Sequence, residues 1–307
     1  MNVALYSHSS CLEHDPGPGH PESPARLRAV LAALDDPGFA ALDRLEAPRA
    51  TREQLARVHW AELIDRIFDH VPQHGWYRLD ADTVMSPASV EAALHAAGAV
   101  CAAVDDAIAG RHQRSFCAVR PPGHHATPTA AMGFCLFNSV AVGAAQALAV
   151  SGLVRVAIVD FDVHHGNGTQ DIFCNDSRVL YASSHQSPLY PGTGARSEEG
   201  LGNIVNVPLP PGAGSYEFRD AYERIVLPAL DSFAPELVMI SAGFDAHRLD
   251  PLANLNLDAD DYVWITERLV ELAERHAQGH IVSSLEGGYN LNALRESVAS
   301  HVAALLG

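Results

Sequence analysis

The sequence predicts an α/β protein built on a parallel β-sheet with helices on both faces. Short apolar segments rich in β-branched residues recur along the 307-residue chain, and stretches with helical spacing of apolar residues separate them. Several of these apolar segments run directly into glycine and ionisable residues. That pattern is typical of strands that lead into a site at the carboxyl edge of an open sheet.

Seven segments are expected to be strands because they are short, apolar and enriched in β-branched or aromatic residues. They cover residues 3–6, 115–119, 154–159, 179–183, 204–207, 237–241 and 281–285. Helical patterns fill most of the intervals, at residues 52–57, 61–70, 89–109, 138–150, 216–233, 259–276 and 291–306. A further helix is expected after Ser23, the predicted N-cap, with Pro24 at its first position. We find no linker or internal repeat, so residues 1–307 are expected to form one domain.

Composition excludes several classes of function. Twenty basic against 37 acidic residues give a net charge of −17, which disfavours binding to nucleic acid. No apolar run approaches the roughly 20 residues that span a bilayer, and residues 1–8 lack the features of a secretory signal. The five cysteines form no Cys-x-x-Cys pair, which argues against a disulfide framework and fits a reducing cytoplasm. Of the 17 histidines, His70, His74, His95, His276 and His301 are expected at the surface.

The run from Asp160 to Gly168 is the strongest functional signal. It reads Asp-Phe-Asp-Val-His-His-Gly-Asn-Gly and follows the predicted strand 154–159. In an extended segment Asp160, Asp162 and His164 share one face while His165 points to the other, so Asp162 and His164 can bind one cation together. A helix cap followed by a turn is the competing interpretation, but it leaves the adjacent ionisable groups unexplained.

Four predicted strands end in polar residues flanked by glycine. These ends carry His124 and His125, the run just described, Asp245, and Tyr289. Because parallel strands place their carboxyl ends on one edge, the four ends can form one pocket. Asp162, His164 and Asp245 would then make a three-ligand metal site with an open position, as catalytic zinc requires.

The remaining polar residues at these strand ends suit hydrolysis. His124 and His125 offer a base near neutral pH, Asp160 and Asn167 are candidates to orient them, and Tyr289 can donate to a developing oxyanion. Each could also have a purely structural role: a loop for the histidine pair, a cap for Asp245, and packing for Tyr289. Phe134 and Tyr190 alone indicate no more than core or rim aromatics.

Five motifs together resemble those of the zinc-dependent histone deacetylase family, which includes bacterial acetylpolyamine amidohydrolases and shares its fold with arginases. They are Arg-Pro-Pro-Gly-His-His-Ala (120–126), Gly-Phe-Cys-Leu-Phe-Asn (133–138), Asp-Phe-Asp-Val-His-His-Gly-Asn-Gly-Thr-Gln (160–170), Ser-Ala-Gly-Phe-Asp (241–245) and Leu-Glu-Gly-Gly-Tyr-Asn (285–290). Asn167, Thr169 and Gln170 stand where class I members carry acidic residues, so the chain is most similar to the class II-like branch.

The resemblance implies an open, mainly parallel eight-stranded sheet sandwiched by helices. It implies zinc at Asp162, His164 and Asp245, with Asp160 behind His124 and Asn167 behind His125, and Tyr289 as the tyrosine that stabilises the transition state. It also implies a substrate tunnel whose members are Gly133, Phe134, Tyr190, Leu252 at the rim, and Gly287.

The resemblance further implies bound potassium. One ion would lie beside the zinc, held by Asp160, the Ser183 hydroxyl and the carbonyls of Asp162, His164 and Ser184. A second monovalent site would involve Phe173, Asp176, Val179 and Asn203.

The expected activity is removal of an acetyl or other short acyl group from acyl-lysine in peptides or proteins. An acetylpolyamine amidohydrolase is the nearest rival: Glu22 and Asp82 favour a cationic substrate, whereas residues 70–86 are too short for the insertion that narrows the entrance of those enzymes. A non-catalytic acyl-lysine-binding protein and arginase chemistry are weaker candidates. Ligand type does not separate zinc from iron(II) or cobalt, and the sequence leaves the oligomeric state and the acyl preference open.

Overall fold

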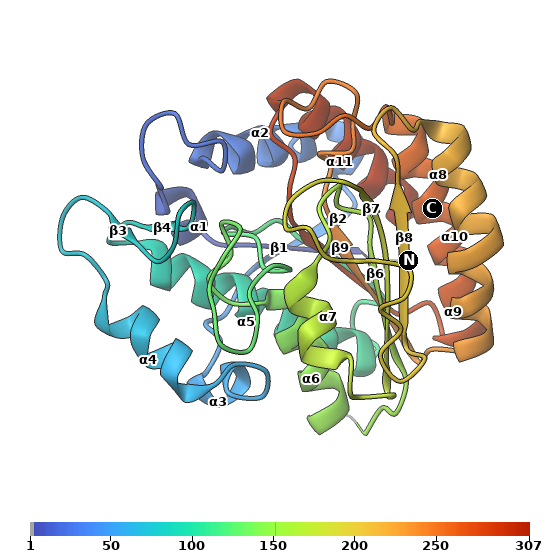
Figure 1. Cartoon of the computed structure of the whole chain (residues 1–307), viewed down its shortest axis with the longest axis horizontal. Coiled ribbons are helices and arrows are strands. Elements are labelled where there is room, and N and C mark those ends of the chain that lie inside the picture. The colour runs from blue at the N-terminus through green and yellow to red at the C-terminus, as the bar shows by residue number, and fades with distance from the viewer. Residues whose placement is uncertain (1–2, 151) are drawn as a thin grey trace.

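The computed structural model describes residues 3–150 and 152–307. Its centre is an eight-stranded sheet in the order β2-β1-β5-β10-β9-β6-β7-β8. Every neighbouring pair in this sheet is parallel, and helices cover both faces (Figure 1). The predicted fold class is therefore confirmed.

All seven predicted strands are present, with ends shifted by three residues at most. The strands of the large sheet are β1 (Val3–Ser7), β2 (Leu42–Glu46), β5 (Arg114–Cys117), β6 (Val156–Asp160), β7 (Val179–Gln186), β8 (Ile204–Leu209), β9 (Leu237–Ala242) and β10 (Ile281–Leu285). Strand β2 was not predicted. Three of its five residues, Leu-Asp-Arg-Leu-Glu, are charged, because β2 lies at the edge of the sheet and pairs only with β1. A separate antiparallel pair, β3 (Tyr77–Arg78) and β4 (Val84–Met85), was also missed because each strand has only two residues.

The predicted helices are likewise present. The helical segments are α1 (Ser10–Glu13), α2 (Pro24–Leu34), η1 (Pro37–Phe39), α3 (Arg52–Leu55), α4 (Ala61–Asp69), α5 (Ser89–Ile108), α6 (Ser139–Val150), α7 (Asn167–Phe173), α8 (Ser215–Ala221), η2 (Tyr222–Val226), α9 (Leu227–Phe233), α10 (Ala259–His276) and α11 (Leu291–Leu306). The stretch predicted as one helix over 216–233 contains a π-helical segment, η2, between α8 and α9. Ser23 precedes α2 as predicted, but its side chain makes no capping hydrogen bond.

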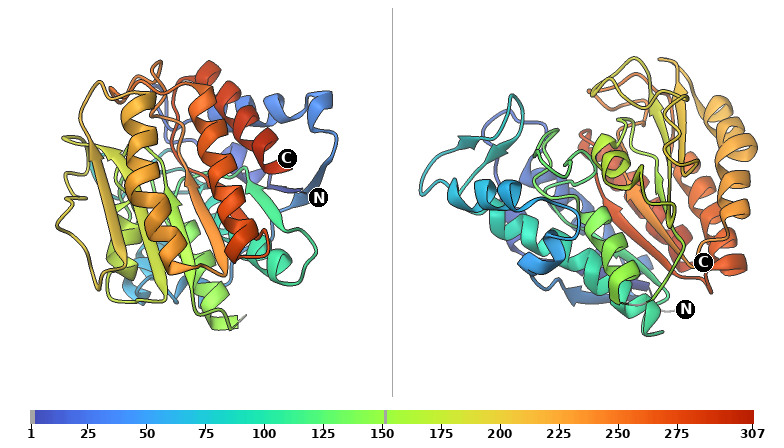
Figure 2. Two further views of the ribbon diagram at one scale, coloured as in Figure 1. Left: turned by 90° about the vertical axis from the view of Figure 1, so that its right-hand side faces the viewer. Right: turned by 60° about the horizontal axis from the view of Figure 1, so that its bottom comes forward.

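The helices form two layers around the sheet. Helices α9, α10 and α11 line up across one face, with α2 packed beside α11, whereas α5, α6 and α7 lie on the other (Figure 2). Alanine and glycine in α5 and α6 let these helices approach closely; a Cβ at Gly143 would meet Val100 at 2.4 Å. Across the described residues, we find no helix with both the length and the apolar character that crossing a bilayer requires.

Two histidines predicted at the surface are buried instead. His301 in α11 is fully buried, and its ring nitrogens bond the hydroxyls of Thr266 and Ser283. His95 in α5 bonds the carbonyl of Ala47. In both cases the helical pattern alone gave no sign that another element supplies a partner for the imidazole.

A fully buried ionic cluster joins the N-terminal loop to two strand ends. The guanidinium nitrogens Nε and Nη2 of Arg120 donate to the Glu22 carboxylate, at 2.5 and 2.7 Å, and Arg26 donates to the same carboxylate at 3.0 Å. His14 lies 3.2 Å from Glu22 on the other side. Burial alone would raise the pKa of Glu22, but the charge of Arg120 and the hydrogen bonds from His14 and Arg120 hold it well below its usual value.

Replacing Glu22 with Gln should destabilise the fold most at neutral pH. Breaking a buried ion pair by removing one partner costs roughly 3–5 kcal/mol. Because the pKa of Glu22 is lowered on folding, its stabilisation is complete above the unfolded pKa and is lost as the pH falls towards the folded value. Urea unfolding of both proteins should therefore show a gap that is large at pH 7 and shrinks below about pH 4.5. A gap that stays constant down to pH 3 would contradict this account.

Candidate active site

Three candidate metal ligands meet at the tips of two neighbouring strands. Asp162 and His164 follow β6, and Asp245 follows β9, which is paired with β6 in register Asp160 to Ser241. His164 Nδ1 lies 3.1 Å from one carboxylate oxygen of Asp162 and 3.1 Å from one of Asp245. One ligand atom from each residue falls within 4.8 Å of the others. The structure thus brings together the three residues that the sequence predicted as a metal site.

The chemistry of these three groups fits a divalent cation. Asp162 and Asp245 are both 1% exposed, so two carboxylates share a buried space. Burial and the neighbouring charge of Asp162 raise the pKa of Asp245 to about 7. A divalent cation between the two carboxylates would offset the repulsion between their negative charges. One imidazole nitrogen with two carboxylates is also a set of ligands that catalytic zinc accepts.

Backbone groups hold the carboxylates in place. The N–H of Val163 donates to Asp245 at 2.9 Å, and the N–H of Gly287 donates to Asp162 at 2.8 Å. Gly287 has no room for a side chain, because a Cβ there would lie 2.1 Å from Asp245 Oδ2 and 2.6 Å from Asp162 Oδ2. Position 287 therefore requires glycine, because the backbone there approaches the two carboxylates too closely for a side chain.

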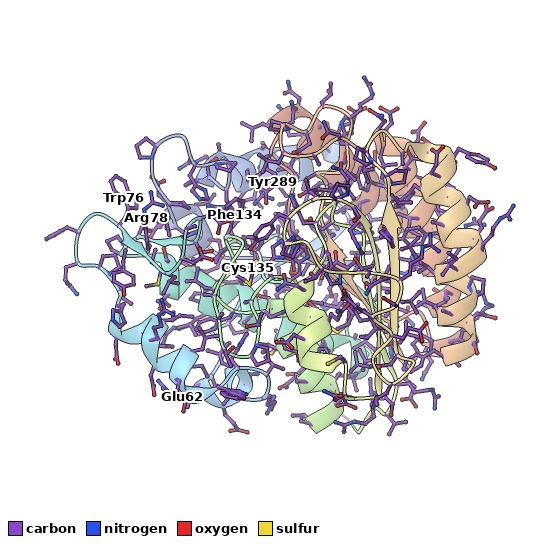
Figure 3. The ribbon with its side chains drawn as sticks, viewed as in Figure 1. Glu62, Trp76, Arg78, Phe134, Cys135 and Tyr289 are labelled. Carbon is purple, nitrogen blue, oxygen red and sulfur yellow. The ribbon has the colours of Figure 1, made fainter. Side chains whose placement is uncertain are left out.

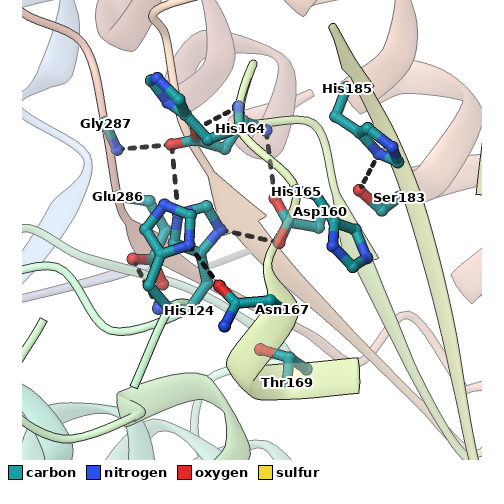
Figure 4. Close-up of polar contacts among 12 residues, drawn as sticks. His124, Asp160, His164, His165, Asn167, Thr169, Ser183, His185, Glu286 and Gly287 are labelled. Carbon is teal, nitrogen blue, oxygen red and sulfur yellow. Dashed lines mark hydrogen bonds and ion pairs between the residues drawn. The ribbon is translucent and has the colours of Figure 1, made fainter. Parts of the chain in front are cut away.

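The two predicted histidines lie beside this centre, each bonded to a different orienting residue. Figure 4 labels His124 and the two orienting residues, Asp160 and Asn167. Nδ1 of His124 donates to Asp160 at 2.9 Å, and Nδ1 of His125 donates to the Asn167 side-chain oxygen at 2.8 Å. Both pairings agree with the sequence prediction. Because Nδ1 of each ring is used in this way, Nε2 is the nitrogen left for the site.

The surroundings of the two histidines shift their pKa values in opposite directions. Burial alone would lower the pKa of His124, but the charges of Asp160 and Asp162 raise it to about 10. Burial lowers the pKa of His125 well below its usual value, and the charges of His124 and His164 act in the same direction. His124 is therefore held as an imidazolium and His125 as a neutral ring that can accept a proton.

A cavity of about 220 Å³ leads to these groups. Its lining residues are Asp82, His125, Gly133, Phe134, His164, Leu189, Tyr190, Leu252 and Tyr289. Phe134 packs edge-on against Tyr289 with ring centroids 5.9 Å apart, and Figure 3 shows the two side chains near the centre of the molecule. Tyr190 packs in the same way against His125, at 5.1 Å. The site is thus a pocket with aromatic walls and its polar groups at the inner end.

Comparison with known proteins agrees with this geometry. Residues 20–305 match the family model described as the histone deacetylase domain. The chain belongs to the histone deacetylase family. Family membership supports a hydrolase of the deacetylase type, and the homologues include proteins with the names histone deacetylase and "Probable deacetylase".

Two relatives and one solved structure illustrate the match. The chain is 39% identical to the chloroplastic histone deacetylase 14 of Arabidopsis thaliana, over 99% of this chain and 76% of that protein. It is 40% identical to the histone deacetylase-like amidohydrolase of Pseudomonas aeruginosa, over 94% and 82%. The crystal structure of the HDA15 HD domain superposes with a TM-score of 0.95 at 39% identity, covering 100% of this chain and 88% of that one.

Most of the deacetylase-like residues predicted from the sequence lie at this pocket. Gly133, Phe134, Tyr190, Leu252 and Tyr289 line it, while Gly287 lies behind the metal ligands. Two groups lie elsewhere. One consists of Asp160, the last residue of β6, and of Ser183 and Ser184 within β7, where Ser183 pairs with Asp160. The other consists of Phe173, Asp176, Val179 and Asn203, which cluster at the end of α7. Glu22, expected near a cationic substrate, is buried against Arg120 and does not face the mouth, so that expectation was wrong.

Sequence reasoning missed the residues that hold Tyr289 and His124 in place. Asp250 accepts a hydrogen bond from the Tyr289 N–H at 2.7 Å. Arg26 stacks on the Tyr289 ring at 4.8 Å and donates to the carbonyls of Glu286 and Gly288 on either side of Gly287. The Glu286 carboxylate accepts from the N–H groups of Gly123 and His124. These contacts join distant parts of the chain, and only the Leu-Glu-Gly-Gly-Tyr-Asn motif pointed to one of them.

Replacing Gly287 with Ala should weaken metal binding. The added methyl would displace both carboxylates, and loss of groups that support metal ligands typically lowers affinity about 10–100-fold. Competition with a zinc-responsive chelating dye measures this without any substrate. Gly214→Ala is the matched control, since a Cβ there meets nothing nearer than 3.4 Å. If Gly287→Ala bound zinc as tightly as the unmodified protein, a side chain at position 287 would not disturb the carboxylates, contrary to this prediction.

Proposed function

We propose that this protein is a zinc-dependent hydrolase that removes an acetyl or other short acyl group from the side-chain amine of acyl-lysine in peptides or proteins. The observation that carries the proposal is the pocket itself. His125, His164 and Tyr289 line the inner part of a cavity whose walls are aromatic. A thin apolar chain ending in an amide fits such a space, with its carbonyl carbon beside a base, a metal ligand and a phenol.

In this proposal Asp162, His164 and Asp245 hold the zinc. A zinc ion in this position supplies a Lewis acid that polarises the amide carbonyl and acidifies water. We assign one potassium ion to the neighbouring site formed by Asp160, the Ser183 hydroxyl and the carbonyls of Asp162, His164 and Ser184. This site would lie close to the zinc ligands, between the last residue of β6 and the residues of β7 that pair with it.

The chain's own groups divide the proton chemistry. His125, neutral and oriented by Asn167, takes the proton of the attacking water and later gives it to the departing amine. His124, charged and paired with Asp160, stabilises negative charge beside it. Burial raises the pKa of Tyr289 well above its usual value, so its phenol keeps the proton and donates to the developing oxyanion.

The pocket walls favour a lysine side chain. Phe134 and Tyr190 lie on the lining with Leu252 and Leu189, and aromatic faces can flank the methylene groups of lysine. An acetylated polyamine is the second candidate, and Asp82 is the observation that favours it, because it places a carboxylate on the wall. Glu22 no longer supports that candidate.

The arrangement of groups around the cation site gives less support to a binding protein or to arginase chemistry. A binding protein without turnover has no use for a neutral histidine, a charged histidine and a half-buried phenol around one cation site. Arginase chemistry uses two manganese ions, whereas in the described residues we find one cluster of three potential ligands. Hydrolysis at a single metal therefore fits the groups better.

Tyr289→Phe should fold, keep its zinc and lose most of its turnover. Removing one donor to an oxyanion typically lowers the rate about 10²–10³-fold. We would measure kcat on an acetyl-lysine peptide together with zinc content and thermal stability. Tyr216→Phe provides the control, because that tyrosine is 76% exposed on α8. Turnover close to that of the unmodified protein would refute the role of Tyr289.

Substrate class can be tested with two substrates and one variant. We expect a higher kcat/KM on an acetyl-lysine peptide than on acetylputrescine, and little change on the peptide in Asp82→Asn. A polyamine enzyme would show the opposite order, and its KM for acetylputrescine would rise when the Asp82 charge is removed. That second pattern would replace acyl-lysine by polyamine in the proposal while leaving the hydrolytic mechanism in place.

A further inference from the structure

Three main-chain carbonyl groups converge on one side-chain atom at the far end of α7. The carbonyl oxygens of Phe173, Asp176 and Val179, which we call the carbonyl cradle, lie 2.8, 3.1 and 2.8 Å from Nδ2 of Asn203. Asn203 precedes β8 and is 4% exposed. Oxygen atoms at such distances around one point are the surroundings that a monovalent cation takes, and the family resemblance leads one to expect such a cation here.

The amide nitrogen already stands at the centre of the cradle. Its orientation is fixed from the other side, because the N–H of Leu201 donates to Oδ1 of Asn203 at 3.0 Å. Turning the amide over would place Oδ1 against three carbonyl oxygens and leave the Leu201 N–H facing an NH₂ group. The surroundings are also tight: a Cβ at Gly200 would lie 2.8 Å from Oδ1. An ion therefore has no room unless the side chain leaves.

Charge does not favour an additional ion either. The one carboxylate of the cradle residues, that of Asp176, is engaged by Arg178 at 2.9 and 2.6 Å. The amide NH₂ carries partial positive charge and two hydrogens, which suits carbonyl groups near the end of α7, where the helix dipole is negative. The N–H groups of Asp176 and Val179 also donate to the carbonyls of Phe173 and Asp176, at 2.9 and 3.1 Å, so donors from the chain itself serve all three carbonyls.

We infer that the side-chain amide of Asn203 takes the place of the second monovalent cation, so that the chain uses an internal donor where a bound ion was expected. This inference replaces the sequence expectation that Phe173, Asp176, Val179 and Asn203 together form a second potassium site. It does not depend on the proposed reaction. The carbonyl cradle and the candidate active site lie at opposite ends of α7. This helix begins at Asn167, the hydrogen-bond partner of His125, and ends at Phe173.

Rubidium, a heavy analogue of potassium, tests the inference directly. Crystals of the full chain grown in rubidium chloride should give no anomalous peak within the cradle, whereas crystals of Asn203→Ala should give one. A rubidium peak among the three carbonyls of the unmodified protein would overturn the inference. The potassium site proposed beside the zinc would appear in both proteins, so its presence or absence does not affect the comparison.

Thermal unfolding in solution gives a second test with a matched pair of variants. Without potassium, Asn203→Ala and Asn203→Leu should both unfold about 4 °C or more below the unmodified protein, because buried carbonyls lose a donor. Added potassium should restore Asn203→Ala selectively, since alanine leaves the cradle open and leucine fills it. Asn175→Ala, at an exposed residue of the loop between α7 and β7, should follow the unmodified protein. An equal response of the two Asn203 variants to potassium would overturn the inference.

Discussion

Two aspartates buried side by side are the constraint on which the rest of the structure depends. Asp162 and Asp245 reach the same space from neighbouring strands, and with His164 they form a set that is stable only when positive charge is present. Their approach requires that β6 and β9 be adjacent and parallel, although β7, β8 and several helical segments separate the two strands in the sequence. The order of strands in the sheet thus brings the three candidate metal ligands together.

The same buried charges explain why two adjacent histidines behave differently. His124 faces Asp160 and Asp162 and is held positive, whereas His125 bonds the neutral side-chain amide of Asn167 and lies beside the charge of His124. Two adjacent residues therefore differ in charge: His124 is positively charged, whereas His125 is neutral and can accept a proton. The site obtains both functions without placing two bases of equal strength side by side.

Buried polar contacts connect the strand ends at the candidate active site to the N-terminal part of the chain. Glu22 holds Arg26 and Arg120 together, and Arg26 in turn bonds the main chain around Gly287 and stacks on Tyr289. The loop that carries the phenol is thus positioned by residues from the first tenth of the sequence. Asn203 acts in a comparable way at the other side of the site, where its amide satisfies carbonyls at the end of α7.

The sequence by itself determined the fold class, seven of the eight strands of the large sheet, and the groups that form the site. It could do so because buried strands are apolar, and because Asp162, His164, Asp245, His124, His125 and Tyr289 all follow such strands closely. Only the tertiary structure decided what depends on contacts between distant segments. It showed the edge strand β2, the buried imidazoles of His95 and His301, the ionic cluster around Glu22, and the amide of Asn203 within the carbonyl cradle. The physical reason is that local patterns record which residues avoid water, whereas the partner of a buried polar group is chosen by the packing of elements that the chain brings together from far apart.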